Sequence, residues 1–183
     1  MPAKSALVIL ANGFEEIEAI APVDILRRAG VKVTVAGLSG LEIEGAHGVK
    51  FTADSKLDGL KEEFDAVILP GGGLGAENLS KSYEVRVLVK EMHLKGKIVA
   101  AICASPAVVL APMGILNDKK ITCYPSEKNS LPSNVTFIDK PVVVDGLIVT
   151  SKGPGTAISF GLKLTELLLG KDAADSLKKK LLV

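Results

Sequence analysis

Cys103 has the sequence context of a reactive thiol. It follows the apolar run Lys97–Ile102 and precedes Ala104–Pro106, whose small residues suit a sharp turn from a strand into a helix. The dipole and the unpaired N–H groups at a helix start favour the thiolate, which is the nucleophilic form of cysteine. The alternative is a buried, inert cysteine. That interpretation is favoured for Cys123, which has no such helix start.

Glu18 is a second residue that could do chemistry. Helical spacing over Glu15–Ala29 places it on an apolar stripe with Pro22 and Leu26. A carboxyl group on such a stripe is paired or protonated, and a neutral carboxylic acid can donate a hydrogen bond. Pro22 cannot donate to the Glu18 carbonyl, so we expect the helix to kink there. The alternative is a surface acid, and Glu15–Glu16 are explained by the positive end of the helix dipole.

A glycine-rich loop, Pro70–Ala76, follows the apolar run Ala66–Leu69. Its glycines let backbone N–H groups face a cleft at a helix start, which suits an anion or oxyanion. A dinucleotide site is not supported, because the loop does not follow the first strand and Glu91, about 20 positions on, falls inside a helix. A phosphate loop is excluded because no Gly-Lys-Ser/Thr follows. The alternative is a tight turn without further function.

Short apolar runs that alternate with helical patterns must position these residues. Continuous apolar strands between helices predict an α/β fold, with a doubly wound, mostly parallel sheet sandwiched by helices and two β-hairpin additions. We expect one domain over residues 1–183. The expected strands are Ala6–Ala11, Val31–Ala36, Ala66–Leu69 and Lys97–Ile102. The expected helices are Glu15–Ala29, Glu77–Lys95, Ser105–Ala111, Gly155–Leu169 and Lys171–Leu182. The expected hairpins join Leu41–Ile43 to Val49–Phe51 and Val142–Val144 to Leu147–Val149.

The composition argues against several classes of protein function. The 183 residues carry a formal charge of +1, 4 % aromatic residues and no Trp, which argues against a nucleic-acid partner. The sequence has no apolar run of about 18 residues and no signal-peptide pattern, so we expect no membrane span. Two cysteines do not make a disulfide framework, which favours the cytoplasm. The spacing of His47, His93, Cys103 and Cys123 suggests no metal site. The first helix is apolar nearly all round, which favours a homodimer through it.

Several ordered blocks resemble a known family. These blocks are Ala6–Ala11 followed by Gly13 and Glu15–Glu18, then Pro22–Leu38, Leu69–Ala76, Ala100–Pro106 and Thr150–Ala157. Together they cover nearly the whole chain and resemble the ThiJ/PfpI superfamily, most closely its DJ-one branch (the Parkinsonism-associated protein deglycase, or glyoxalase III, branch). The resemblance implies a flavodoxin-like homodimer with the first helix at the interface.

The resemblance also implies a site. It implies that Cys103 is a nucleophile on a sharp turn, that Glu18 is a protonated acid bonded to its sulfur, and that the amides of Gly72 and Ala104 hold an oxyanion. No cofactor is implied.

Residues that differ from the family pattern restrict the reactions that we expect. Ala104 stands where the protease-like members carry His, which counts against a cysteine peptidase or amidase. Tyr124 stands where some DJ-one members have His, and it is the candidate third member of the site. His47 and Lys152 stand where relatives often carry Arg. Together with Arg28 they are the candidate anion contacts.

The resemblance therefore implies a cysteine-dependent, cofactor-independent glyoxalase or protein deglycase. Its substrates would be methylglyoxal-type α-oxoaldehydes or their early adducts on amines and thiols. The alternative from the same residues is a redox-sensing stress-response protein or chaperone, because an accessible, low-pKa thiol is the first to be oxidised by peroxide. In that case Glu18 would stabilise a sulfinate on Cys103.

Overall fold

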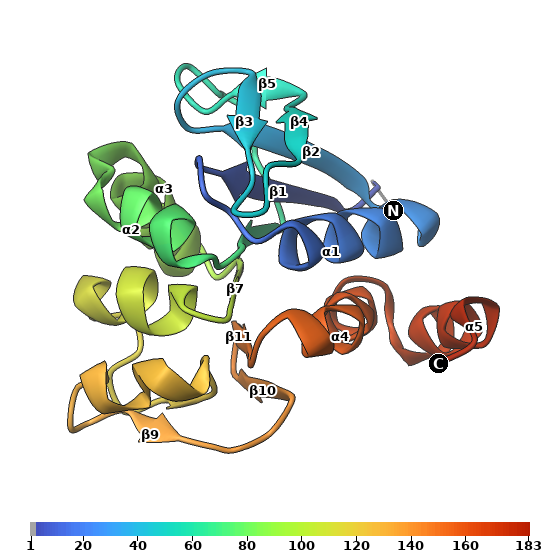
Figure 1. The fold of residues 1–183 in the computed structure, drawn as a ribbon. Coiled ribbons are helices and arrows are strands. Elements are labelled where there is room, and N and C mark those ends of the chain that lie inside the picture. The colour runs from blue at the N-terminus through green and yellow to red at the C-terminus, as the bar shows by residue number, and fades with distance from the viewer. Residues whose placement is uncertain (1–2) are drawn as a thin grey trace.

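A mostly parallel sheet forms the centre of the molecule (Figure 1). The computed structural model describes residues 3–183 and contains a seven-stranded sheet in the order β10-β11-β7-β6-β1-β2-β5. Every neighbouring pair in it is parallel except β10 and β11. The doubly wound architecture expected from the sequence is therefore confirmed. The strands are β1 (Ser5–Leu10), β2 (Lys32–Gly37), β5 (Ser55–Lys56), β6 (Ala66–Leu69), β7 (Ile98–Ile102), β10 (Val142–Asp145) and β11 (Ile148–Ser151).

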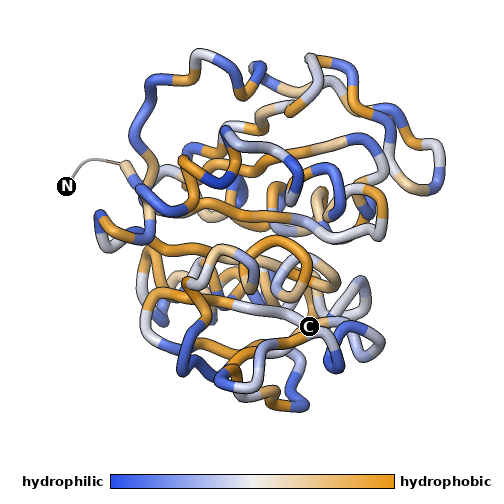
Figure 2. The backbone as a smooth tube through the Cα atoms, turned by 90° about the vertical axis from the view of Figure 1, so that its left-hand side faces the viewer, coloured by the Kyte–Doolittle hydropathy of each residue, from blue (hydrophilic) through white to orange (hydrophobic). Residues whose placement is uncertain are grey.

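The central strands are apolar on both faces because helices cover both sides of the sheet. Alternate side chains of β1 enter two separate cores: Leu7 and Ile9 join one, and Val8 and Leu10 join the other. Figure 2 shows hydrophobic segments concentrated through the middle of the molecule and hydrophilic segments toward its periphery. The first core includes apolar residues of α2 (Gly73–Lys81) and α3 (Tyr83–Leu94). The second includes those of α1 (Glu16–Arg28) and α4 (Ala157–Leu169). Helix α5 (Lys171–Leu181) packs on α4.

Two predicted helices differ from those in the structure. The single helix expected over Glu77–Lys95 is broken at Ser82, whose hydroxyl caps α3 by accepting a hydrogen bond from the Val85 N–H (3.1 Å). The helix expected over Ser105–Ala111 is a π-helix, Pro106–Leu110, followed by the 3-10 turn Ala111–Met113. The turn after β7 therefore opens onto a short, irregular helix.

The hairpin predictions are confirmed. β3 (Glu42–Glu44) pairs antiparallel with β4 (Lys50–Thr52), and β10 pairs antiparallel with β11. A smaller parallel pair joins β8 (Lys120–Ile121) to β9 (Thr136–Phe137), and 3-10 helices cover Pro125–Ser130 and Pro154–Thr156. Across residues 3–183, the helices are all too short or too polar to cross a bilayer.

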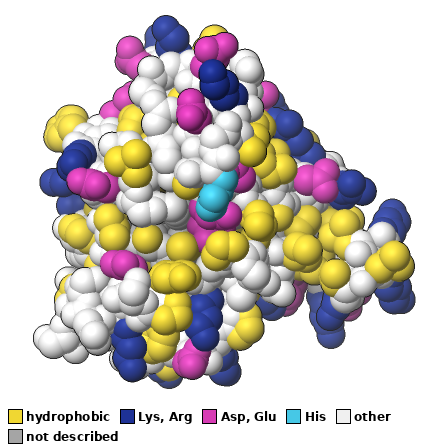
Figure 3. Space-filling model, in the orientation of Figure 1, with side chains coloured by type: hydrophobic (Ala, Val, Ile, Leu, Met, Phe, Trp, Pro, Cys, Tyr) yellow, Lys and Arg dark blue, Asp and Glu magenta, His cyan; other side chains and the backbone are white. Residues whose placement is uncertain are grey.

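Hydrophobic side chains also reach the surface near α1 and α4. Ile17 and Ile20 on α1 are 55 % and 38 % exposed, and Ile158 on α4 is 43 % exposed. Figure 3 shows a band of hydrophobic side chains in this part of the molecule, bordered by charged groups. A surface of this kind on one helix pair is typical of a protein–protein interface.

Candidate active site

Cys103 lies on a strained turn at the carboxyl end of β7. Its φ angle is +64°, a left-handed conformation that residues other than glycine adopt rarely. Hydrogen bonds hold the turn on both sides: the Cys103 N–H donates to the Ser151 carbonyl (3.0 Å), and the Cys103 carbonyl accepts from the Tyr124 N–H (2.7 Å). A strained strand-to-helix turn presents a nucleophile in this way in other folds. The thiol is 8 % exposed, whereas Cys123 is fully buried.

Glu18 brings a carboxyl group from α1 to the same place. The residue is fully buried, and its Oε2 accepts a hydrogen bond from the Gly71 N–H (2.8 Å). Its Oε1 is buried and has no hydrogen-bond partner among the described residues. Cys103 lies beside the carboxyl group, since a Cβ on Gly71 would contact both Glu18 Oε2 (2.5 Å) and Cys103 Cβ (2.6 Å). The two residues that the sequence singled out separately therefore meet.

The glycine loop supplies the amides of the site. The backbone N–H groups of Gly72 and Ala104 are close enough to the Cys103 thiol to lower its pKa. Gly72 has a φ of +89°, and a Cβ there would lie 2.3 Å from the Gly13 carbonyl oxygen. A side chain at this position would therefore displace the amide. Two convergent N–H donors beside a nucleophile form the arrangement that stabilises an oxyanion in acyl-transfer chemistry.

Burial governs the proton equilibria of the pair. Burial raises the pKa of the Glu18 carboxyl to about 7, and the nearby charge of Glu15 also raises it. Once Glu18 is ionised, burial and then the charge and hydrogen bond of Glu18 raise the pKa of the Cys103 thiol to about 12, while the Gly72 and Ala104 amides lower it. Burial therefore opposes the effect of the helix start, and a thiolate at this turn stays a prediction. Since the two groups interact directly, the pair loses one proton near neutral pH and holds the second to high pH.

Glu15 is a site residue that the sequence analysis missed. Its Oε2 accepts a hydrogen bond from the Glu18 N–H (2.7 Å), and its own N–H donates to the Gly71 carbonyl (3.0 Å). The residue is only 8 % exposed. The sequence analysis attributed Glu15 to the helix dipole alone, since one sequence gives no sign that the residue before α1 also contacts the glycine loop.

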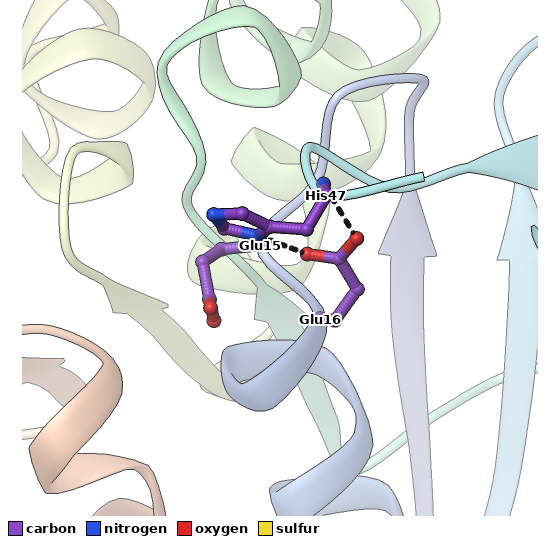
Figure 4. Close-up of side chains that lie close together, drawn as sticks. All are labelled: Glu15, Glu16 and His47. Atoms are coloured by element: carbon purple, nitrogen blue, oxygen red, sulfur yellow. Dashed lines mark hydrogen bonds and ion pairs between the residues drawn. The ribbon is translucent and has the colours of Figure 1, made fainter. Parts of the chain in front are cut away.

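Glu16 turns to the opposite side and holds the β3–β4 hairpin loop. Its Oε1 accepts from the His47 N–H (2.7 Å) and its Oε2 contacts His47 Nδ1 (2.7 Å), as Figure 4 shows. The hydrogen bond that the Glu16 carboxylate accepts from the His47 ring raises the pKa of His47. Donor atoms of Glu15, Glu16 and His47 lie within 4.8 Å of one another, but both carboxylates already accept backbone N–H groups. The observed role of this cluster is to anchor the loop.

The remaining candidate residues lie around or away from this centre. Tyr124 is joined to Cys103 through its backbone, and its ring packs over Gly153, where a Cβ would lie 3.3 Å from Tyr124 Cδ2. Tyr124 and Lys152 line a shallow pocket of about 220 Å³. The Lys152 amine is paired with Asp139 (2.5 Å), so it does not offer a free cation there.

Arg28 does not reach the site within one chain. It lies about 15 Å further along α1 than Glu18, and its guanidinium pairs with Asp24 (2.6 Å). Within one chain Arg28 therefore does not reach Cys103, and its contact with a bound anion stays a prediction. The physical reason is that Arg28 and Glu18 lie at opposite ends of one helix.

Comparisons with known proteins identify the family of the chain. Residues 4–167 match the model of the DJ-1/PfpI family. The chain is 46 % identical over 183 residues to protein dj-1beta of Drosophila melanogaster, covering 98 % of this chain and 97 % of that one. It is 38 % identical over 181 residues to a Caenorhabditis elegans protein named glutathione-independent glyoxalase DJR-1.2, covering 97 % and 96 % of the two chains.

Solved structures give the same result. The crystal structure of Drosophila melanogaster DJ-1beta superposes with a TM-score of 0.95 and covers 99 % of this chain and 98 % of that one, at 46 % identity. Oxidized Toxoplasma gondii DJ-1 also gives a TM-score of 0.95, at 39 % identity and with 98 % of each chain covered. The match extends over the sheet, the flanking helices and the turn that carries Cys103. The chain belongs to the DJ-1/PfpI family.

Proposed function

We propose that the protein is a cysteine-dependent glyoxalase that needs no cofactor and acts on methylglyoxal-type α-oxoaldehydes, or as a deglycase on their early adducts with amines and thiols. The observation that carries the proposal is the environment of one sulfur atom. Cys103 faces two backbone N–H donors and the buried carboxyl group of Glu18. The name of the Caenorhabditis elegans relative supports the glyoxalase class.

The proposed reaction begins with the thiolate of Cys103. It attacks the aldehyde carbon, a C–S bond forms, and the carbonyl π electrons move to the oxygen, which the Gly72 and Ala104 amides stabilise. Neutral Glu18 then donates its proton to that oxygen. As a carboxylate, Glu18 next removes the hydrogen from the former aldehyde carbon as a proton, and the electron pair forms an enediolate whose negative charge lies on the former ketone oxygen.

The remaining steps return the enzyme to its starting state. Glu18 gives the proton to the former ketone carbon, and the hydroxyl proton on the former aldehyde oxygen moves to the former ketone oxygen, which leaves a 2-hydroxy thioester on Cys103. Water then cleaves the C–S bond and releases the hydroxy acid, lactate from methylglyoxal, and the thiol returns its proton to the Glu18 carboxylate. The aldehyde carbon is oxidised and the ketone carbon is reduced by the same pair of electrons, so no external oxidant or reductant is required.

Methylglyoxal consumption without glutathione tests this proposal. Cys103→Ala removes the nucleophile and should abolish turnover, whereas Cys123→Ala should leave it unchanged because that thiol is fully buried elsewhere. Glu18→Gln keeps the shape of the side chain but cannot exchange protons, so the rate should fall by about 10²–10⁴-fold. Near-normal rates in Cys103→Ala or Glu18→Gln would contradict the proposal.

A redox role is a second candidate supported by the same sulfur atom. Cys103 has some exposure, whereas Cys123 has none. If Cys103 is a peroxide sensor, mild peroxide should convert it to the sulfinate while Cys123 remains a thiol. Mass spectrometry of the two cysteine peptides distinguishes them, and equal oxidation of both would overturn this candidate.

We also propose that two copies associate through α1. Ile17 and Ile20 form an exposed apolar pair on this helix. Ile17→Glu with Ile20→Glu should convert a dimer to a monomer in sedimentation experiments, because two buried charges without partners are costly. Leu94→Glu is the matched control, since this exposed apolar residue lies on α3. Both free cysteines are consistent with the cytoplasm as the location we propose.

A further inference from the structure

We propose that Glu15 is a positioning residue for the catalytic pair: its negative charge keeps the proton on Glu18 and thereby leaves the charge of the pair on Cys103. The inference rests on the proposed function, because it supplies the proton arrangement with which that reaction begins. It concerns a residue that does not itself touch the reacting sulfur in the proposed steps.

Three hydrogen bonds connect Glu15, Glu18 and Gly71 in a closed ring. The Glu18 N–H donates to Glu15 Oε2 (2.7 Å), the Gly71 N–H donates to Glu18 Oε2 (2.8 Å), and the Glu15 N–H donates to the Gly71 carbonyl (3.0 Å). The ring fixes the first turn of α1 to the glycine loop. Movement of the Glu15 carboxylate away from Glu18 would therefore require a break in this ring.

Burial strengthens the electrostatic interaction between the Glu15 and Glu18 carboxyl groups. Glu18 is fully buried and Glu15 is 8 % exposed, so little water separates or screens their carboxyl groups. Two carboxylates in such a place do not both ionise easily, and one retains its proton. Glu15 accepts a backbone N–H at the positive end of α1, where an acidic side chain is stabilised. Glu18 is more deeply buried than Glu15 and lies beside a thiol, so Glu18 is the acid that holds the proton.

Few other groups act on Glu18. Among the described residues, the groups that shift the pKa of Glu18 are Cys103, Glu15 and the Gly71 amide. Neither α4, which packs against α1, nor the β3–β4 hairpin contributes a charge that does so. Glu16 points to His47 and is absent from that set. Besides burial, Glu15 is therefore the group among the described residues that raises the pKa of Glu18 and so favours the proton there.

The experiment compares Glu15→Gln with Glu16→Gln. Both remove one negative charge from the same helix end, but only Glu15 is bonded to Glu18, and the amide oxygen of the introduced glutamine can still accept the Glu18 N–H. Thiolate absorbance is measured against pH, with Cys103→Ser as the baseline. We expect Glu15→Gln to reduce the thiolate population at neutral pH by about tenfold. This corresponds to a change of one unit in the difference between the pKa values of Cys103 and Glu18. Glu16→Gln should retain it.

A second pair keeps the test informative if Glu15→Gln does not fold. Asp and Asn are both strong N-caps and differ in charge, so Glu15→Asp should keep the thiolate and Glu15→Asn should lose it. Equal thiolate populations in Glu15→Gln and wild type, or in the Asp and Asn variants, would overturn the inference.

The inference and the proposed function can fail separately. If Glu15→Gln loses thiolate while wild type never consumes methylglyoxal, the proton arrangement stands and the glyoxalase proposal fails. If wild type consumes methylglyoxal and Cys103→Ala does not, but Glu15→Gln retains the thiolate, the proposed function stands and the role of Glu15 fails. Circular dichroism and thermal unfolding of every variant identify a loss that comes from misfolding.

Discussion

Glu18 and Cys103 meet across Gly71, and the space between them admits no side chain. A Cβ on Gly71 would lie 2.5 Å from Glu18 Oε2 and 2.6 Å from Cys103 Cβ. Residues on α1, after β6 and after β7 thus converge on one point at the carboxyl end of the sheet, where α/β folds with open parallel sheets place their ligands.

Gly71→Ala should damage the site more than the fold. The added methyl group must displace either the acid or the nucleophile, and overpacking of this kind costs about 1–3 kcal/mol. Methylglyoxal turnover should fall at least tenfold, and thermal unfolding should move to lower temperature. Gly73→Ala is the matched control, because nothing lies within 4 Å of a Cβ at that position. Equal effects of the two substitutions would contradict this account.

The free energy of unfolding should depend on pH through Glu18. In the folded chain the pair of Glu18 and Cys103 loses its first proton at about pH 7, whereas Glu18 in the unfolded chain has a pKa of 4.5, so between these values the folded state binds more protons than the unfolded state. Stability from this group is therefore greatest below about pH 4.5 and is lost as the pH rises through 7, with a change on the order of 3 kcal/mol. Urea unfolding at several pH values measures it, and Glu18→Gln should flatten this part of the profile. A profile of unchanged slope in that variant would contradict the shift.

His47 should report on the loop anchor. The hydrogen bond that the Glu16 carboxylate accepts from the His47 ring raises the pKa of His47, so Glu16→Gln should lower that pKa. The stability that this contact supplies is present at low pH, where the imidazolium exists, and is lost as the pH rises through the raised pKa. Proton NMR titration of the imidazole follows it, with His93 as the internal reference. An unchanged His47 titration would show that the contact is absent in solution.

The break between α2 and α3 should depend on one cap. Ser82→Ala removes the hydroxyl that accepts the Val85 N–H and should destabilise the chain by about 1 kcal/mol. Ser80→Ala provides the comparison, because the Ser80 hydroxyl donates to a carbonyl one turn back on an exposed helix face. Chemical denaturation of both variants measures the difference, and similar losses would argue against a specific capping role for Ser82.

The strands of the sheet were predicted more accurately than the helices that follow the glycine-rich loop and the Cys103 turn. Continuous apolar runs such as Ala66–Leu69 have few alternatives to a buried strand, and the structure places that strand within the same bounds. The helix after Cys103 was predicted from Pro106 and helical propensity alone, and neither distinguishes a π-helix from an α-helix. Ser82 inside an otherwise helical pattern gave too weak a local signal for the break.

Only some residues of the site could be predicted from the sequence. Cys103 and Glu18 were identifiable because each breaks a local rule: a thiol at a sharp turn, and an acid on an apolar stripe. Glu15 was not, since an acid at a helix start obeys every local rule and its contact with Gly71 depends on tertiary structure. The opposing influences on the pKa of Cys103 also needed the structure, because burial and the charge of an ionised Glu18 raise this pKa while the Gly72 and Ala104 amides lower it.

The thiolate titration of wild-type protein tests the central claim most directly. Absorbance of the Cys103 thiolate, taken as the difference from Cys103→Ser, is followed from acidic to alkaline pH. If neutral Glu18 holds the proton of the pair, the thiolate signal should rise in a step close to pH 7, where the pair loses its first proton. A thiolate that forms only above about pH 9, like an ordinary cysteine, would place the proton on the sulfur and contradict the account.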